Sequence, residues 1–441
     1  MRTAILIAAL GAGTVASARE TTLFSGARVI VGDGAVVESA TLVVTDGRIE
    51  SVTAVEPAGI PPGASRVSLA GKTVMPLLID VHGHVGFLKD GVFSGGSYGA
   101  ANIIEQLSIL EYYGVGAFQS LGTDIGPDAF RVRSDQRAGK IGGARLLVAG
   151  RGFVAPGGGP TVSPLEHVPF EVDRPEIARL LVRENAEKGC DAVKVWVDDR
   201  NGTRPKLPPE IYRAVIDEAH QLGMRVIAHV YYLEDAKELL RAGVDGFAHM
   251  VRDVELDDEF LRLAKEKNVF QASALAVQAM PVDSGWLNDP AFREATPKSV
   301  LARLEAGDTG FPGGGSAERA EQFRSLMKKN VAKLEAAGIP IALGGDTGIP
   351  TRFVGFNEHL ELRAMVAVGM TPLEAISAGT SVAASVLRLD DLGALAPGKS
   401  ADFLVLDANP LEDIAHTTRI AGVYRKGKPI DRAALRESWM R

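Results

Sequence analysis

Two histidines separated by one residue, His82 and His84, end an apolar run that is typical of a buried β-strand. Alternate residues of a strand point to the same side, so both imidazoles would be directed at one point. Three more residues that can bind a metal end other apolar runs of the chain: His229, His249 and Asp346. Four imidazoles and a carboxylate suit a borderline divalent metal such as zinc.

A lysine, Lys194, lies inside another apolar run, Ala192-Val193-Lys194-Val195-Trp196. A buried ammonium is costly unless it is paired, so the lysine indicates either a structural salt bridge or a chemical role. Each of these features alone is weak evidence. Together they place ligand-capable residues on five strand-like runs in one order, which chance rarely produces.

These runs belong to residues 76–385, where strand-like segments alternate with helical patterns. In one helical pattern, apolar residues recur on a single face at Ile211, Ala214, Val215, Ala219 and Leu222. Eight alternations predict a closed (β/α)8 TIM barrel, in which active sites form at the carboxyl ends of the strands. The eight strand-like runs are 77–81, 117–121, 145–149, 192–197, 225–228, 246–248, 269–274 and 340–343.

An open, doubly wound α/β sheet is the alternative fold. It is disfavoured because no glycine-rich phosphate-binding motif follows a strand. Both ends of the chain read as short strands with turns, including Asp46-Gly47, a strong hairpin signal. We therefore expect residues 19–75 and 386–441 to form one small β-sandwich domain around the barrel of residues 76–385.

Residues 1–18 have the layout of a secretory signal peptide: a basic start, a short apolar run and an A-x-A pattern ending at Ala18. A frayed N-terminal helix is the alternative. The prediction is an exported protein, periplasmic or secreted, without stable membrane insertion after cleavage. Cys190 is the single cysteine, so no internal disulfide is expected.

The composition is that of an ordinary globular protein, with 46% hydrophobic and 23% charged residues. The net charge is −7, which argues against nucleic acid as a partner because binding to phosphates needs clustered positive charge. A small molecule is the expected ligand, and a homo-oligomer remains open.

From about residue 22 to residue 430, the sequence resembles the amidohydrolase superfamily, in particular its imidazolonepropionase-like and prolidase-like (Xaa-Pro dipeptidase-like) branch. The resemblance is carried by four motifs: Val74 to His84, Gly344-Gly345-Asp346-Thr347, Ala378-Gly379-Thr380 with Ala383-Ala384, and Leu392 to Phe403. Two positions depart from the usual pattern, Leu77 in place of a glycine and the bulky Tyr231-Tyr232 after His229.

The resemblance implies a hydrolase of an amide-type C–N bond, in a dipeptide, an N-acyl amino acid or a related amide or carbamate. In two-metal members, His82, His84 and Asp346 would hold one ion, and His229 with His249 the other. Lys194, carbamylated by carbon dioxide, would bridge the two ions, most plausibly zinc. A metal-bound hydroxide would attack the carbonyl, and Asp346 would be the catalytic residue that moves the proton.

The same residues also fit two other functions. Lys194 could instead form a salt bridge beside a single metal, as in a mononuclear deaminase or a cyclic-amide hydrolase of the imidazolonepropionase type. A relative that uses the barrel only for binding or assembly would have lost ligands, whereas all six are present.

Residues on the loops after the strands are candidates for binding the substrate. They are His167, Tyr231 and Arg252, of which Arg252 could hold a carboxylate. A structural role is an equal alternative for His167 and Tyr231 and the favoured interpretation for Arg252. Asp198 and Trp196 are interpreted as loop anchors. The remaining histidines are expected to have no part in the chemistry: His220, His359 and His416.

Overall fold

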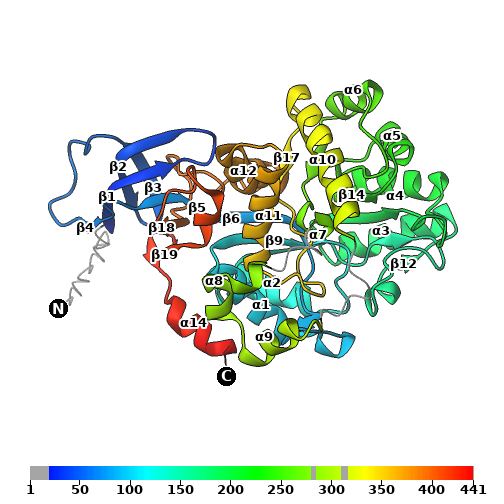
Figure 1. Cartoon of the computed structure of the whole chain (residues 1–441), viewed down its shortest axis with the longest axis horizontal. Coiled ribbons are helices and arrows are strands. Elements are labelled where there is room, and N and C mark those ends of the chain that lie inside the picture. The colour runs from blue at the N-terminus through cyan, green and yellow to red at the C-terminus, as the bar shows by residue number, and fades with distance from the viewer. Residues whose placement is uncertain (1–18, 280–284, 309–315, 441) are drawn as a thin grey trace, which may run out of the picture.

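The computed structural model describes residues 19–279, 285–308 and 316–440. The signal-peptide prediction concerns residues 1–18, which lie outside the described part. Figure 1 shows a large unit of strands and helices on one side and a smaller unit of strands, built from both chain ends, on the other.

The large unit contains two sets of parallel strands that follow one another in chain order. Backbone hydrogen bonds join the sets into a barrel, from Asp191 to Val148 O (2.7 Å) and from Val81 to Leu343 O (2.9 Å). The predicted (β/α)8 barrel is confirmed, and each predicted run contains one strand or most of it. The strands are β6 Leu78–Gly83, β9 Val115–Ser120, β10 Arg145–Val148, β13 Ala192–Val197, β14 Arg225–Val230, β15 Gly246–Phe247, β16 Phe270–Ala272 and β17 Ile341–Ala342.

The third strand of the barrel is interrupted, which the sequence does not indicate. β10 pairs with β9, whereas the next short strand, β11 Phe153–Val154, pairs with β13 and with β12 Phe170–Glu171. The peptide between β10 and β11 passes Gly150 and Gly152, where an added Cβ would meet Cys190 or Trp196 at under 3 Å. Glycine is therefore required for this bend in the barrel wall.

Helices surround the strands and bury one apolar face each. In α4, Ile211, Ala214, Val215 and Ala219 are buried as predicted, but Leu222 at the helix end is 44% exposed. Periodicity alone could not show that the helix stops at Gln221. The surrounding helices are α1 Ala100–Tyr112, α2 Asp128–Arg137, α3 Pro175–Glu187, α4 Pro209–Gln221, α5 Leu233–Ala242, α6 Asp258–Glu266, α10 Ala317–Ala337 and α11 Phe356–Ala367.

Shorter elements complete the barrel unit. One apolar cluster packs helices α8 and α9 against α1, α11 and the C-terminal helix α14. Their bounds are α7 Ala276–Ala279, α8 Pro290–Ala295, α9 Lys298–Glu305, α12 Pro372–Ser377, the π-helix η5 Ala378–Val382, α13 Ala383–Val386 and α14 Arg432–Trp439, with the short strands β7 Leu88–Lys89 and β8 Val92–Phe93. No helix of the described residues is both long enough and apolar enough to cross a bilayer.

Strands from both chain ends form one continuous eight-stranded sheet, in which β5 pairs with β18 across the two ends. The hydrogen-bonding pattern therefore does not show the two separate sheets of the expected sandwich. Asp46 and Gly47 both have positive φ between β2 and β3, as a two-residue hairpin turn requires. The strands are β1 Thr21–Ile30, β2 Val36–Thr45, β3 Arg48–Thr53, β4 Ser65–Ser68, β5 Thr73–Pro76, β18 Phe403–Leu406, β19 Ile420–Arg425 and β20 Lys428–Pro429.

A buried histidine on α11 makes the fold sensitive to acid. His359 is fully buried, and its Nε2 donates a hydrogen bond to Tyr113 O at 2.8 Å. Burial lowers the pKa of His359 to about 4. Below about pH 6.5 the unfolded chain takes up a proton that the folded chain does not. The free energy of unfolding therefore decreases as the pH is lowered from about 6.5 to about 4.

Between about pH 7.5 and about pH 5, the unaltered protein should lose about 2 kcal/mol of its free energy of unfolding because of His359. The variant His359→Gln should not show this loss, because glutamine can still donate to Tyr113 but does not titrate. Urea unfolding at both pH values measures the difference. The same change at His167, whose side chain is 82% exposed, serves as the control. Equal pH dependence in H359Q and in the unaltered protein would contradict the assignment.

Candidate metal centre

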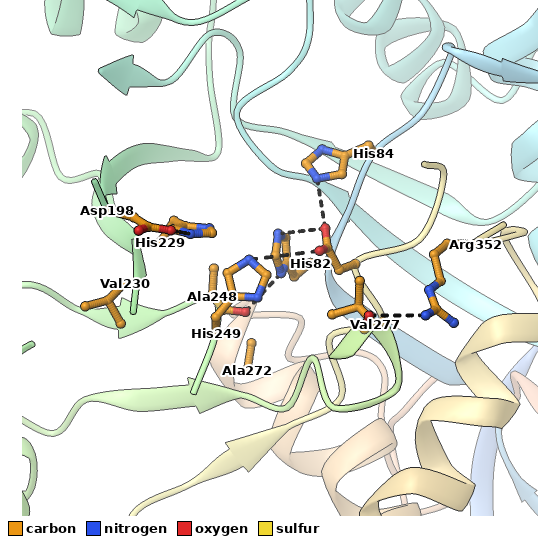
Figure 2. A network of polar contacts seen from close by, with 12 residues as sticks. His82, His84, Asp198, His229, Val230, Ala248, His249, Ala272, Val277 and Arg352 are labelled. Carbon is orange, nitrogen blue, oxygen red and sulfur yellow. Dashed lines mark hydrogen bonds and ion pairs between the residues drawn. The ribbon is translucent and has the colours of Figure 1, made fainter. Parts of the chain in front are cut away.

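The six predicted ligands converge at the carboxyl ends of the barrel strands. His82 and His84 come from the end of β6, Lys194 from β13, His229 from β14, and the remaining two from the segments after β15 and β17. All six side chains are buried, with at most 8% of each residue exposed. Figure 2 shows the rings of His82, His84 and His249 close together, with His229 beside them next to Asp198.

Asp346 lies at the centre of this cluster. Its carboxylate oxygens are 3.0 Å from His84 Nε2, 3.5 Å from His82 Nε2 and 4.0 Å from His249 Nε2. Asp346 has φ of 50°, a left-handed conformation that is unusual for a residue other than glycine. Its backbone N–H donates to His82 O at 2.8 Å, which fixes the loop after β17 against β6.

Two imidazoles are oriented by bonds from the nitrogen that faces away from Asp346. His82 Nδ1 donates to Ala248 O (3.1 Å), and His84 Nδ1 bonds to Thr123 Oγ1 (2.9 Å). Because a carbonyl only accepts, the proton of His82 is on Nδ1, and the lone pair of Nε2 faces the cluster. This is the arrangement by which proteins fix histidine ligands of metal ions.

His229 is oriented in the opposite sense. Its Nε2 donates to Asp198 Oδ2 at 2.9 Å, which leaves Nδ1 as the nitrogen with a free lone pair. The rings of His229 and His249 lie 4.4 Å apart between centroids, and His249 Nδ1 is buried without a hydrogen-bond partner. These two histidines therefore form a second group of potential ligands beside the group around Asp346.

Lys194 is completely buried, and its Nζ has no hydrogen-bond partner. The ring centroid of Trp196 lies 5.3 Å from Nζ. A structural salt bridge for this lysine is thus not present among the described residues. Burial lowers the pKa of Lys194 to about 7, so a large share of the side chain is the neutral amine at neutral pH.

The electrostatics of the cluster favour metal-binding protonation states. Burial lowers the pKa of His229 to about 3 and takes those of His82 and His249 well below their usual value. These three imidazoles are therefore neutral. The pKa of Asp346 is lowered: burial opposes ionisation, but the nearby histidines and Lys194 outweigh it. Neutral imidazoles and an ionised carboxylate are the forms that bind divalent metals.

The three tentative substrate residues lie in different settings. Tyr231 and Arg252 are close together, with the guanidinium 5.1 Å from the ring centroid. Arg252 Nη2 donates to Val230 O (2.9 Å) and lies 3.5 Å from His229 Nε2, beside the cluster. His167 is instead exposed and 3.4 Å from Glu166, and no described contact joins it to the ligands.

Sequence reasoning assigned no role at the centre to several residues that the structure brings there. Asp198, interpreted as a loop anchor, does accept from Arg200 N (2.8 Å), but it also orients His229. Its position directly after β13 was the available signal. Thr123 was not singled out. Arg352, only 5% exposed, donates to Val277 O (3.2 Å) at the edge of the cluster in Figure 2, and burial lowers its pKa to about 10.

A sequence model of the amidohydrolase family matches residues 73–430. The chain belongs to the amidohydrolase family. The resemblance read from the motifs is thereby confirmed, and the ligand cluster lies within the matched region.

Two named proteins are similar in sequence to parts of this chain. Ochratoxinase of Aspergillus niger is 28% identical over 272 residues, which are 58% of this chain and 49% of that protein. The chain thus aligns with about half the length of this relative. Imidazolonepropionase of Pyrobaculum arsenaticum is 33% identical over 111 residues, 24% of this chain and 28% of that protein.

Solved structures share the fold over nearly the whole chain. A putative prolidase from Bifidobacterium longum has a TM-score of 0.71 at 27% identity and covers 96% of this chain and 99% of its own. A Xaa-Pro dipeptidase with methionine bound in its active site has a TM-score of 0.72 at 22% identity, with coverages of 93% and 100%.

Asp198 provides a test of the orientation of His229. The variant Asp198→Asn keeps the size of the side chain but removes the charge that holds the Nε2 proton, so metal affinity should fall by about 10–100-fold. Competition with a chromogenic chelator measures the affinity. Asp199→Asn, which alters the neighbouring carboxylate bonded to Tyr232, is the matched control. Unchanged affinity in D198N would show that the His229–Asp198 bond has no part in metal binding.

Proposed function

We propose that the protein is a metal-dependent amidohydrolase with two metal ions bridged by a carbamate on Lys194. The observation that carries the proposal is the buried, unpartnered Nζ of Lys194 beside four imidazoles and a carboxylate. An ammonium in this position would be desolvated and unpaired, which costs several kcal/mol. Conversion to an anionic ligand removes that penalty.

The donor groups fit two ions. His82, His84 and Asp346 would hold one, since the Nε2 atoms of both histidines lie 3.0–3.5 Å from Asp346 Oδ1. His229 and His249 would hold the other. The neutral amine of Lys194 would add to the carbon of carbon dioxide, with one N–C bond formed, one C=O π bond broken and one proton released to solvent. The resulting carbamate would supply anionic oxygen donors to the site. Imidazole and oxygen donors suit zinc.

The bound ions would supply a water of lowered pKa and a polarised substrate carbonyl. The chain's own residues would do the rest. Asp346, a carboxylate that the surrounding histidines and Lys194 keep ionised, would accept the proton of the attacking water and pass it to the leaving nitrogen. Arg252 would hold a carboxylate of the substrate, with Tyr231 packed against it.

The substrate class follows from the amide chemistry of the relatives and from the position of Arg252. Its Nε is buried without a partner, and it forms no ion pair among the described residues. An anionic ligand would accept hydrogen bonds from this guanidinium and balance its charge. A dipeptide or an N-acyl amino acid carries a carboxylate next to the scissile amide and is the substrate that we propose.

A single-metal enzyme is the second candidate, either a deaminase or a cyclic-amide hydrolase. One observation favours it: the ligand atoms of His82, His249 and Asp346 lie within 4.8 Å of one another, as one ion would require. In that case Lys194 stays an uncharged amine. The number of metal ions per chain separates the two candidates.

Elemental analysis of metal-replete protein should give two metal equivalents per chain, and a carbamate carbon signal should appear by 13C NMR. One stable equivalent without a carbamate signal would refute the dinuclear site.

Lys194→Ala should lose metal and activity together, whereas Asp346→Asn should keep at least one metal while hydrolysis falls by about 100-fold or more. Near-normal turnover in D346N would show that Asp346 is not the proton carrier.

Arg252→Met should lower kcat/KM about 100-fold for N-acyl amino acids but much less for the corresponding carboxamides, because only the carboxylate loses a charged partner. A screen of both substrate series measures the difference. Arg204→Met, on a neighbouring loop, is the control. An equal loss for both series would mean that Arg252 acts through the structure and not through the substrate carboxylate.

A further inference from the structure

A hollow of about 560 Å³ opens at the end of the barrel opposite the metal centre, where β14 to β17 begin. Arg225, the first residue of β14, lies in its wall. Lys267 and Asn268 follow helix α6, and Arg388 follows helix α13. The hollow therefore lies between the barrel strands and the segment that leads back to the small sheet.

The charges in this hollow are unbalanced. Arg225, Lys267 and Arg388 are cationic, and none of them forms an ion pair with another described residue. Asp245 is the one acidic residue of the lining. Its carboxylate already accepts hydrogen bonds from His220 Nε2 (2.9 Å) and Val226 N (2.8 Å). Three positive charges against one negative leave a net charge of +2.

The arginines repel each other across the hollow. Arg225 is half-buried and is held by a hydrogen bond from Nη2 to Val386 O. Burial lowers the pKa of Arg225, the charge of Arg388 lowers it further, and Asp245 acts in the opposite direction. Three cations opposed by a single carboxylate are unfavourable, and a bound anion would offset this cost.

Two lining residues occupy a backbone conformation that favours glycine. Asn268 has φ of 53° at the end of α6, and Arg388 has φ of 55° at the end of α13. Glycine is the usual residue at such helix ends. Asparagine is also common at such helix ends, whereas arginine is not, so the guanidinium of Arg388 is held beside the hollow in a strained backbone conformation.

We propose that this hollow binds a small phosphate dianion, either inorganic phosphate or the phosphoryl group of a phosphate monoester. A dianion neutralises the net charge of +2. Guanidinium groups match the geometry of phosphate oxygens and bind them with paired, charge-assisted hydrogen bonds. The lysine adds a third positive charge, and the exposed Ser385 adds a hydroxyl donor. The site is separate from the metal centre and does not depend on the proposed reaction.

Calorimetric titration of the full-length protein with inorganic phosphate, and in parallel with glycerol phosphate, tests the proposal at constant ionic strength. We expect saturable binding that weakens at least about tenfold in the double variant Lys267→Gln/Arg388→Gln. Both side chains are exposed, so the fold should persist. Tighter binding of glycerol phosphate would identify a phosphorylated metabolite as the ligand, and equal binding would identify free phosphate.

Two controls separate this site from others. Lys265→Gln, an exposed lysine on α6 outside the hollow, should leave phosphate binding unchanged. Phosphate bound at the metal centre would persist in the double variant. Equal affinity in the double variant and in the unaltered protein, or no saturation below about 10 mM, would overturn the proposal.

Discussion

The burial of positive groups beside a few carboxylates is the constraint on which the candidate metal centre depends. Lys194 and Arg352 are almost inaccessible to solvent, and Arg252 lies beside His229. The charge of Asp346 acts on all three, but Asp198 acts more strongly on Arg252 and Glu361 more strongly on Arg352. Lysine can respond by losing its proton, and burial does lower its pKa to about 7. Arginine stays charged at neutral pH. These charges are the reason for proposing a carbamate at the lysine and a carboxylate-bearing substrate at Arg252.

The candidate ligands and the groups that orient them are positioned by the barrel strands and the residues directly after them. Five of the six proposed ligands come from a strand end or from the few residues after it, and Lys194 lies within β13. The orienting bonds come from residues on or just after neighbouring strands. Ala248 O, just after β15, fixes His82 on β6, and Asp198, just after β13, fixes His229 on β14. Because backbone and buried side chains supply these bonds, the donor atoms are positioned before any metal binds, which lowers the entropic cost of assembling the site.

The sequence predicted the elements whose signal is local. Apolar runs located all eight barrel strands, and the candidate ligands in or after these runs lie together in the structure. What it missed depends on contacts between distant segments. Asp198 acts through the ring orientation of His229, 31 residues further on. Thr123 matters only because β9 lies beside β6. Similarly, the strands of the two chain ends were foreseen, but their joining into one sheet is decided by the pairing of β5 with β18.

The two ends of the barrel are connected by the same strands. β14 begins with Arg225 in the basic hollow and ends next to the orienting partner of His229. A ligand in the hollow would stabilise the folded chain by mass action. It would change the metal centre only if the strands had a second arrangement, since coupling between sites requires an element with two states. Short, fully paired parallel strands offer no such alternative. We therefore expect the hollow to influence the stability of the barrel more than the chemistry at its other end.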